Sequence, residues 1–272
     1  MIQQSISIRH QLSAVIYVTD MITGRAVDHQ RLTFMLEPTG TTPIYKNEGY
    51  YVYSNLPAGI YRLIVHSLDY GIVIRQWEWN PQQKDPPVFQ LLLQPSPAYL
   101  FATKITRIYC RCVDVVGAPI TDVPLTLYSR SPENSRARLR KKTNVEDQTL
   151  EVATTGVRSL AGESYLLCSI HEDIEHNEPI EIKSFPQLND QVWQLISPLS
   201  HSYTAGALLL PIVRATTDHR GEAVLVIRSL PSSKGQFELV AGYSDQKPYI
   251  SKMLTIQESE VISLQLTISD SC

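Results

Sequence analysis

Residues 48–65 have the sequence EGYYVYSNLPAGIYRLIV, and the same pattern returns at residues 220–241 as RGEAVLVIRSLPSSKGQFELVA. Each copy has a glycine, a β-rich run, a Leu-Pro pair, a second glycine and, two residues later, an aromatic residue that opens a strand. Because successive strand side chains alternate between two faces, every second residue of these strands should face the core. We expect those core residues to be Tyr61, Leu63 and Val65 in the first copy and Phe237, Leu239 and Ala241 in the second. The pattern predicts one β-module used twice.

Further strands are expected on both sides of the repeated stretch. The runs AVIYVTD (14–20) and IYCRCVD (108–114) open the two copies, and VFQLLL (88–93) and VISLQLTI (261–268) close them. An insertion of about residues 130–215 interrupts the second copy before Gly221. It alternates enough around Ala161 and Gly162 to predict a hairpin, so we expect a small added subdomain there.

The repeat resembles the carboxypeptidase regulatory-like domain, which is a transthyretin-like β-sandwich. The first copy carries the resemblance in TGRAV, EGYYVYSNLPAGIYRLIV and the Asp69-Tyr70 pair, and the second copy matches less closely, with LPSSKG in place of LPAG. The resemblance covers residues 12–95, 104–130 and 215–270. It implies an all-β fold of two tandem transthyretin-like or immunoglobulin-like β-sandwiches, at residues 1–97 and 98–272. In that family the module serves as a scaffold or binding appendage.

Composition narrows the possible environments and partners. A formal net charge of −3 gives no broad attraction to nucleic acid or to an anionic membrane surface. No stretch has the length of a transmembrane helix, so no direct membrane insertion is expected. The first twenty residues lack the pattern of a signal peptide, and four cysteines are too few for a disulfide framework. These features predict a cytoplasmic protein, which could act within a large particle.

Motifs for catalysis are missing from the sequence. It has no Gly-x-Ser-x-Gly elbow, no P-loop and no Rossmann glycine pattern, so we expect neither enzymatic activity nor a cofactor. The acidic stretch at residues 171–178 holds His171 and His176, which are five residues apart, whereas a zinc-binding helix needs ligands one turn apart. We interpret this stretch as a solvated acidic loop. Cys110 and Cys112 alternate on a predicted strand and are interpreted as packing thiols.

A basic run lies in the insertion and consists of Arg136, Arg138, Arg140, Lys141 and Lys142. Aromatic residues for base stacking do not interleave with it, which argues against single-stranded nucleic acid. We interpret the run as a solvated loop, with a protein contact as the next interpretation.

Two further groups are candidates for interaction. Trp77 and Trp79 alternate, so both indoles should share one face of a strand, where core packing is favoured over an exposed sugar platform or interface anchor. Ile2, Ile6 and Ile8 alternate with polar residues before the first module begins. Such an arm can add as a strand to the edge of its own sheet or of a neighbour's.

These observations predict a non-enzymatic structural or interaction protein. Its expected partners are other protein subunits in a homo- or hetero-oligomeric assembly, and a phage-tail-like contractile injection particle is the concrete hypothesis. One alternative is a carbohydrate- or cell-surface-binding module that uses Trp77 and Trp79 or the insertion loops. A second alternative is a hydrolase with its site in the insertion.

Overall fold

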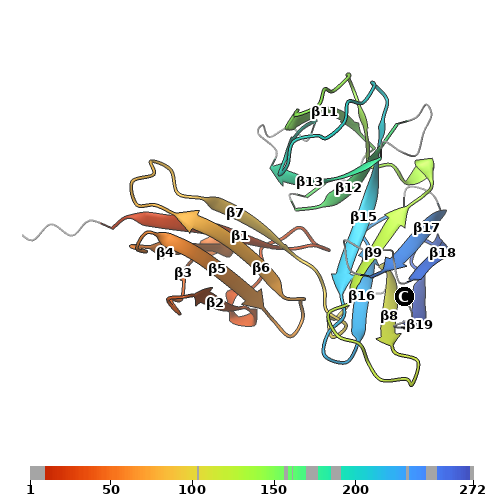
Figure 1. The fold of residues 1–272 in the computed structure, drawn as a ribbon, viewed down its shortest axis with the longest axis horizontal. Helices are drawn as coiled ribbons and strands as arrows, with labels where there is room; N and C mark the ends of the chain where they lie inside the picture. Colours follow the sequence, from red (N-terminus) through yellow and green to blue (C-terminus); the bar gives the residue numbers. More distant parts are fainter. Residues whose placement is uncertain are drawn as a thin grey trace, which may run out of the picture. The chain divides into compact units, whose positions relative to one another are not determined.

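The protein is all-β in a computed structural model, which describes residues 10–102, 104–155, 159–160, 162–169, 177–184, 191–230, 233–242 and 250–269 (Figure 1). Across these residues only three 3₁₀ turns accompany the strands, and no helix is long and apolar enough to cross a membrane. The chain divides into two compact units, Met1–Leu93 and Gln94–Cys272. The predicted fold class, with more than one β-sandwich and a long insertion in the second, is confirmed.

The first unit is a sandwich of a mixed sheet, in which β1 and β7 pair in parallel, and an antiparallel sheet. One sheet has the order β3-β4-β1-β7 and the other has the order β2-β5-β6. The strands are β1 (Leu12–Asp20), β2 (Thr33–Glu37), β3 (Ile44–Lys46), β4 (Tyr50–Ser54), β5 (Gly59–His66), β6 (Val73–Trp79) and β7 (Val88–Leu93). The predicted core residues Tyr61, Leu63 and Val65 of β5 are all buried, as the alternation requires.

The second unit repeats this sandwich. Its strands are β8 (Thr106–Val113), β9 (Pro124–Ser129), β16 (Glu222–Ile227), β17 (Lys234–Ala241), β18 (Ile250–Gln257) and β19 (Val261–Thr267). The sheet β16-β8-β19 corresponds to β4-β1-β7, and in both the opening and closing strands pair in parallel. The order β9-β17-β18 corresponds to β2-β5-β6. The duplication inferred from the sequence is therefore also a duplication of topology.

The insertion forms a closed antiparallel barrel. Its strands are β10 (Ala137–Leu139), β11 (Thr149–Thr154), β12 (Ser164–Cys168), β13 (Glu178–Ser184), β14 (Val192–Leu195) and β15 (Leu208–Thr216). Pairing runs β10-β11-β14-β13-β12-β15 and returns to β10, which closes the ring (Figure 1). Trp193 and Tyr165 lie in its interior. The later part of β15 pairs with β9, so barrel and sandwich share one strand.

The barrel corrects one expectation about the insertion. The predicted hairpin around Ala161 and Gly162 would pair β11 with β12, but β11 pairs with β10 and β14 instead. Ala161 itself lies outside the described residues. A barrel closed by the β11–β14 and β10–β15 pairings replaces the local hairpin, and its core buries Tyr165 and Trp193 with their rings 5.0 Å apart.

The described cysteines are buried free thiols. Cys110, Cys112 and Cys168 are each at most 9% exposed, which confirms the interpretation of the first two as packing residues. Burial raises the pKa of the Cys110 thiol to about 12 and that of Cys112 and Cys168 to about 11. The neighbouring Cys112 also contributes to the pKa increase at Cys110.

The raised pKa values of these thiols predict that the folded protein loses stability at alkaline pH. The unfolded chain releases the thiol protons near pH 9.0, whereas the folded chain keeps them to about pH 11, so the unfolded state binds fewer protons in this interval. Stability should therefore fall as pH rises, by up to about 1.4 kcal/mol per pH unit for each thiol. Urea unfolding between about pH 8 and pH 10 measures the slope. A double variant, Cys110→Ala with Cys112→Ala, should show a shallower slope, and an unchanged slope would contradict the prediction.

Candidate binding site

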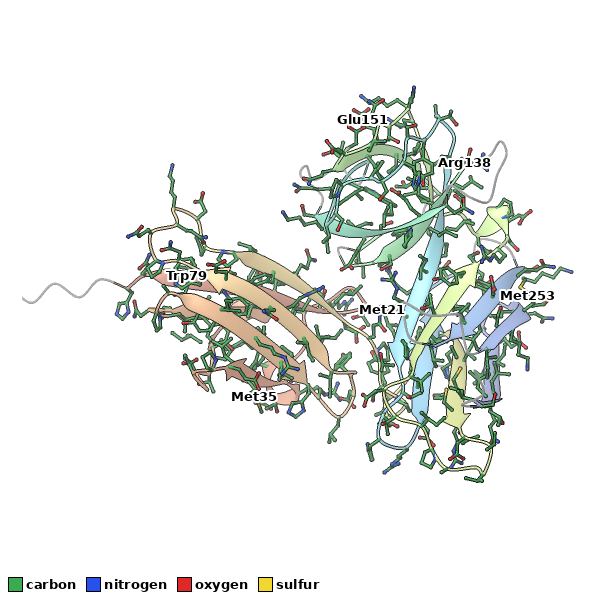
Figure 2. All side chains as sticks on the ribbon, viewed as in Figure 1. Met21, Met35, Trp79, Arg138, Glu151 and Met253 are labelled. Carbon is green, nitrogen blue, oxygen red and sulfur yellow. The ribbon has the colours of Figure 1, made fainter. Side chains whose placement is uncertain are left out.

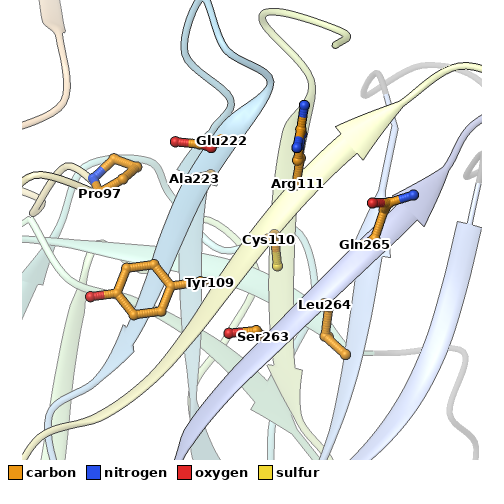
Figure 3. Close-up of a pocket in the computed structure, with 9 residues that line it drawn as sticks. All are labelled: Pro97, Tyr109, Cys110, Arg111, Glu222, Ala223, Ser263, Leu264 and Gln265. Carbon is orange, nitrogen blue, oxygen red and sulfur yellow. The ribbon is translucent and has the colours of Figure 1, made fainter. Parts of the chain in front are cut away.

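An open groove of about 500 Å³ lies on the outer face of the sheet β16-β8-β19 in the second unit (Figure 3). Its side chains come from all three strands and from the segment that precedes β8. Those with polar or aromatic chemistry are Tyr109, Arg111, Glu222, Ser263 and Gln265, and Pro97 borders them. The volume is within the range of about 300–1,000 Å³ that is usual for ligand sites.

Strand register brings these residues together. Arg111 of β8 lies opposite Glu222 of β16 on one side and Gln265 of β19 on the other. The three side chains therefore form a polar row across the sheet. In the next row, Tyr109 lies opposite Ser263. The strand alternation that places Tyr109 and Arg111 outward places Cys110 inward, toward the sandwich core.

An aromatic cluster closes one side of the groove. The rings of Tyr99 and Phe101 lie 4.9 Å apart, and Phe101 meets the Tyr109 ring edge-on at 6.3 Å. The Arg107 guanidinium lies over Phe101 at 4.9 Å and near Tyr109 at 5.8 Å. Cation–π and edge-to-face contacts of this kind hold side chains in place. Tyr109 is thereby half-buried and fixed at the border of the polar row.

The side chains of the polar row have hydrogen-bond donors and acceptors that are available to a ligand. Within the described part of the chain, the side chains of Arg111, Glu222 and Gln265 form no hydrogen bond or ion pair with protein groups. Together they offer a rigid fork of N–H donors, a carboxylate acceptor and an amide that does both. The nearby Cys110 thiol faces away and stays protonated, with a pKa of about 12. The groove is thus equipped for non-covalent binding and contains no activated nucleophile among its described lining residues.

The structure confirms the favoured interpretation of Trp77 and Trp79 as core residues and corrects their candidate role in interaction. Trp79 is 1% exposed and its indole N–H donates to the Leu56 carbonyl at 3.1 Å. Trp77 is 7% exposed, and its ring lies 5.6 Å from that of Tyr61 and 5.2 Å from that of Phe89. Both indoles project from the inner face of β6 into the core, which rules out the sugar platform that would need them exposed.

The basic run is also placed differently from the solvated loop that the sequence suggested. Arg136 is 5% exposed, and its Nη2 donates to the Ser229 carbonyl. Arg138 points to solvent from strand β10, and Arg140, Lys141 and Lys142 are exposed (Figure 2). Lys141 pairs with Glu151 at 2.5 Å. Ala137 and Leu139 enter the barrel core, so of this run Arg138 lies in strand β10, Arg136 is buried directly before that strand, and the other three residues follow it.

Two other sequence candidates lie outside the described residues. They are the arm residues Ile2, Ile6 and Ile8, and most of the acidic stretch, including His171 and His176. From that stretch Asn177 and Glu178 are described, and the Glu178 carboxylate accepts from the Ser200 N–H and lies 3.0 Å from His201 Nδ1. No group of metal-binding side chains gathers within the described part of the chain.

Sequence reasoning did not single out the groove residues. Alternation along β8 places Tyr109 and Arg111 on one face, which was the available signal. The pairing with Glu222 and Gln265 joins positions more than 100 residues apart, and local patterns contain no information about that register.

Comparisons with known proteins do not place the chain in a family. No family model matches it, and no curated protein matches it in sequence. Solved structures with some similarity include the Bacillus anthracis TIE protein (11% identity, TM-score 0.27), of which the chain covers 34% while 95% of the chain is matched. The chain thus spans about a third of the length of that protein.

Two other solved structures are similar over most of both chains. The shaft pilin SpaA from Lactobacillus rhamnosus GG has 8% identity and a TM-score of 0.26, with coverage of 96% of this chain and 98% of the pilin. The family 26 carbohydrate-binding module from Eubacterium rectale Amy13K, solved with maltoheptaose, has 8% identity, a TM-score of 0.22 and 94% coverage of both chains. TM-scores this low support no inference about function.

Proposed function

We propose that the protein is a non-catalytic binding protein whose second unit holds a polyhydroxylated ligand, such as an oligosaccharide, in the groove on β16-β8-β19. The observation that supports this most directly is the row of Glu222, Arg111 and Gln265, whose side chains have no partner within the described residues. A bound ligand would complete their hydrogen bonds. The half-buried Tyr109 ring offers an apolar surface beside this row.

The balance of donors and acceptors favours a sugar over an anion. A phosphate or carboxylate site collects cations and excludes carboxylates, whereas here the Arg111 guanidinium lies directly opposite Glu222. Sugar hydroxyls donate and accept at the same time, so they can satisfy a carboxylate, a guanidinium and an amide together.

The proposal predicts a loss of affinity when the groove is altered. Titration calorimetry with maltoheptaose, cellohexaose, xylohexaose and chitohexaose should show binding of at least one of them. Arg111→Ala should weaken that binding about tenfold or more, because a hydrogen bond to a charged group contributes about 1.5–3 kcal/mol. Tyr109→Ala should also weaken it, because it removes the ring surface beside the polar row. Arg62→Ala in the first unit, which removes an exposed arginine paired with Glu37, is the matched control. Absence of binding to all four probes, or equal affinity in every variant, would refute this function.

A second candidate function is that of a subunit in a larger protein assembly. It is favoured by exposed apolar side chains on β2, β5 and β6 and in the connection between β5 and β6. These are Met35 (48% exposed), Ile60 (62%), Leu68 (90%), Ile72 (69%) and Ile74 (47%). Large apolar side chains left exposed on one sheet and the connection beside it are a feature of protein contact surfaces. A contractile injection particle is one such assembly, and none of the described features singles it out.

Both sandwiches are further proposed to be of the carboxypeptidase regulatory-like, transthyretin-like type. The support is the shared order of strands in the two copies, including the parallel pairs β1-β7 and β8-β19. A family of homologous sequences that keeps Gly49, Gly59, Gly221 and Gly235 would test this assignment.

A further inference from the structure

The two sandwiches differ at one edge, and the difference identifies a place for another strand. In the second unit, β9 pairs with β17 on one side and with Ile212–Thr216 of β15 on the other. Its counterpart in the first unit is β2, which pairs with β5. On its other side β2 has no strand partner within the described residues. The same fold therefore has this edge covered in one copy and open in the other.

The side chains beside this edge also differ between the two units, and they are more apolar in the first unit, where the edge is open. Met35 of β2 lies opposite Ile64 of β5, and Ile64 lies opposite Ile74 of β6, which makes an apolar row across the outer face. The corresponding row of the second unit is Thr126, Val240 and Ser251. Met35 and Ile74 are about half exposed. The open edge thus adjoins apolar side chains, while the covered edge adjoins a mostly polar row.

Two other edge strands, β6 and β18, are protected against strand addition in a way that β2 is not. Arg75 of β6 lies opposite the core residue Leu63, and Lys252 of β18 lies opposite Leu239, so both edges have a cation on their inner face. Inward-facing charges are a known defence against edge-to-edge pairing. The inner face of β2 has Phe34 and Leu36 instead. Among these edges, β2 is the one built to accept a strand.

The N-terminal arm of a second copy fits this edge by sequence and by direction. Residues 2–8 alternate, with Ile2, Ile6 and Ile8 on one face of an extended strand. The described chain begins next to the turn between β4 and β5, where the Gln11 N–H donates to Asn55 Oδ1 at 2.9 Å. Glu37, the last residue of β2, is at the same end, because it pairs with Arg62 near the start of β5.

This geometry excludes the chain's own arm as an antiparallel partner. The arm ends where β2 also ends, so it could run beside its own β2 only in parallel. β15 pairs with β9 antiparallel, which is the arrangement realised at the equivalent edge. We propose that residues 2–8 of one copy add as an antiparallel strand to β2 of a second copy, beside Met35. Reciprocal exchange gives a dimer, and one-way exchange gives a ring or chain of subunits.

The test measures association of the full chain by sedimentation velocity over a range of concentrations. The wild-type protein should sediment at a mass at least twice that of the 30.7 kDa chain. Ile6→Lys in the arm and Met35→Glu on β2 should each weaken association about tenfold or more, which corresponds to about 1.4 kcal/mol. Combining the two substitutions should restore part of the association, because they place opposite charges side by side.

Thr126→Glu is the matched control, since it puts the same charge at the equivalent position of the covered edge. It should leave association unchanged. Urea unfolding of the Ile6→Lys variant should match that of the wild-type protein, which separates a loss of association from misfolding of the sandwich.

Cysteine cross-linking identifies the occupant. Copies with Ile6→Cys, mixed under oxidising conditions with copies with Met35→Cys, should form a disulfide between chains. A monomer at every concentration overturns the proposal, as does cross-linking only within one chain that carries both cysteines. Association that is lost with Met35→Glu but kept with Ile6→Lys also overturns it, because another surface would then cover β2. The saccharide titration in the preceding section is independent of all these outcomes.

Discussion

Glu163→Ala is expected to lower the free energy of unfolding of the second unit by about 3–5 kcal/mol, since it removes one partner of a mostly buried ion pair. The Glu163 carboxylate accepts from Arg228 Nη1 at 2.5 Å, from the Tyr165 hydroxyl at 2.6 Å and from the Leu160 N–H at 2.8 Å. The side chains of Glu163 and Arg228 are 14% and 17% exposed. Alanine would remove the Glu163 carboxylate from beside the Arg228 guanidinium, in a site that water scarcely reaches.

The same cluster connects the barrel to the sandwich that carries it. Arg228 follows β16 of the sandwich and donates to Glu163 in the barrel, while Arg136 at the start of β10 donates back to the Ser229 carbonyl. Burial lowers the pKa of Arg136, and Tyr165 and Glu163 oppose that shift. Burial, with Glu163 next, raises the pKa of the Tyr165 hydroxyl. Losing Glu163 therefore removes its ion pair with Arg228 and a favourable negative charge near Arg136. Both interactions help to hold the barrel against the sandwich.

Urea unfolding followed by the fluorescence of Trp193 measures this prediction, because Trp193 lies in the barrel core 5.0 Å from the Tyr165 ring. Trp77 and Trp79 in the first unit are replaced by phenylalanine in both proteins, so that Trp193 is the remaining indole. The matched control is Glu151→Ala, which breaks the exposed Lys141–Glu151 pair and should cost about 1 kcal/mol or less. Equal losses of unfolding free energy in Glu163→Ala and Glu151→Ala would contradict the prediction, because the buried pair would then stabilise the protein no more than the exposed pair does.

Gly221→Ala should destabilise the second sandwich by about 2–4 kcal/mol, since strain and a close contact with backbone coincide there. Gly221 has φ +70°, in the left-handed region that a side chain disfavours. An added Cβ would lie 2.5 Å from the Cys112 carbonyl oxygen, which belongs to a central strand and cannot move away cheaply. Its counterpart Gly49 has φ +82°, with Ala26 Cβ and the Val18 carbonyl oxygen at 2.7 and 3.0 Å from the added atom.

Two other glycines separate strain from contact. Gly117→Ala meets open space at φ +88°, so strain alone should cost about 1–2 kcal/mol. Gly59→Ala in the first unit has no positive φ and no atom nearer than 4.0 Å, so we expect almost no change. Urea unfolding of the three variants gives the comparison. If Gly221→Ala lowers the free energy of unfolding no more than Gly117→Ala does, the prediction is wrong, and β8 shifts to make room for the new side chain.

These glycines explain why the fold could be predicted from local sequence. The first glycine of each repeat allows the backbone to turn where a Cβ would collide, and the strand after the Leu-Pro pair alternates faces. The opening strands end similarly, because Asp20 Oδ1 accepts from the Ile22 and Thr23 N–H groups and Asp114 Oδ1 accepts from those of Val116 and Ala118. Each of these effects acts between residues close in the chain, so each leaves a pattern in the sequence.

The burial of the candidate site residues, in contrast, depends on residues that are distant in the sequence. The spacing of Trp77 and Trp79 correctly places both on one face of β6, yet only the position of that face against Tyr61 and Phe89 shows that they are buried. Arg136 was grouped with a basic loop because its neighbours are charged. Its burial depends on Ser229, which is distant in the sequence and adjacent in the fold.

The sequence by itself determined the repeated sandwich, its core-facing residues and the all-β class, because backbone strain, turn chemistry and strand alternation are local. The closed barrel, the polar row of Glu222, Arg111 and Gln265, and the open edge of β2 were decided only by the tertiary structure. Each of them depends on which distant strands pair and in what register. That choice is made by the burial of a whole core, and no short stretch of residues encodes it.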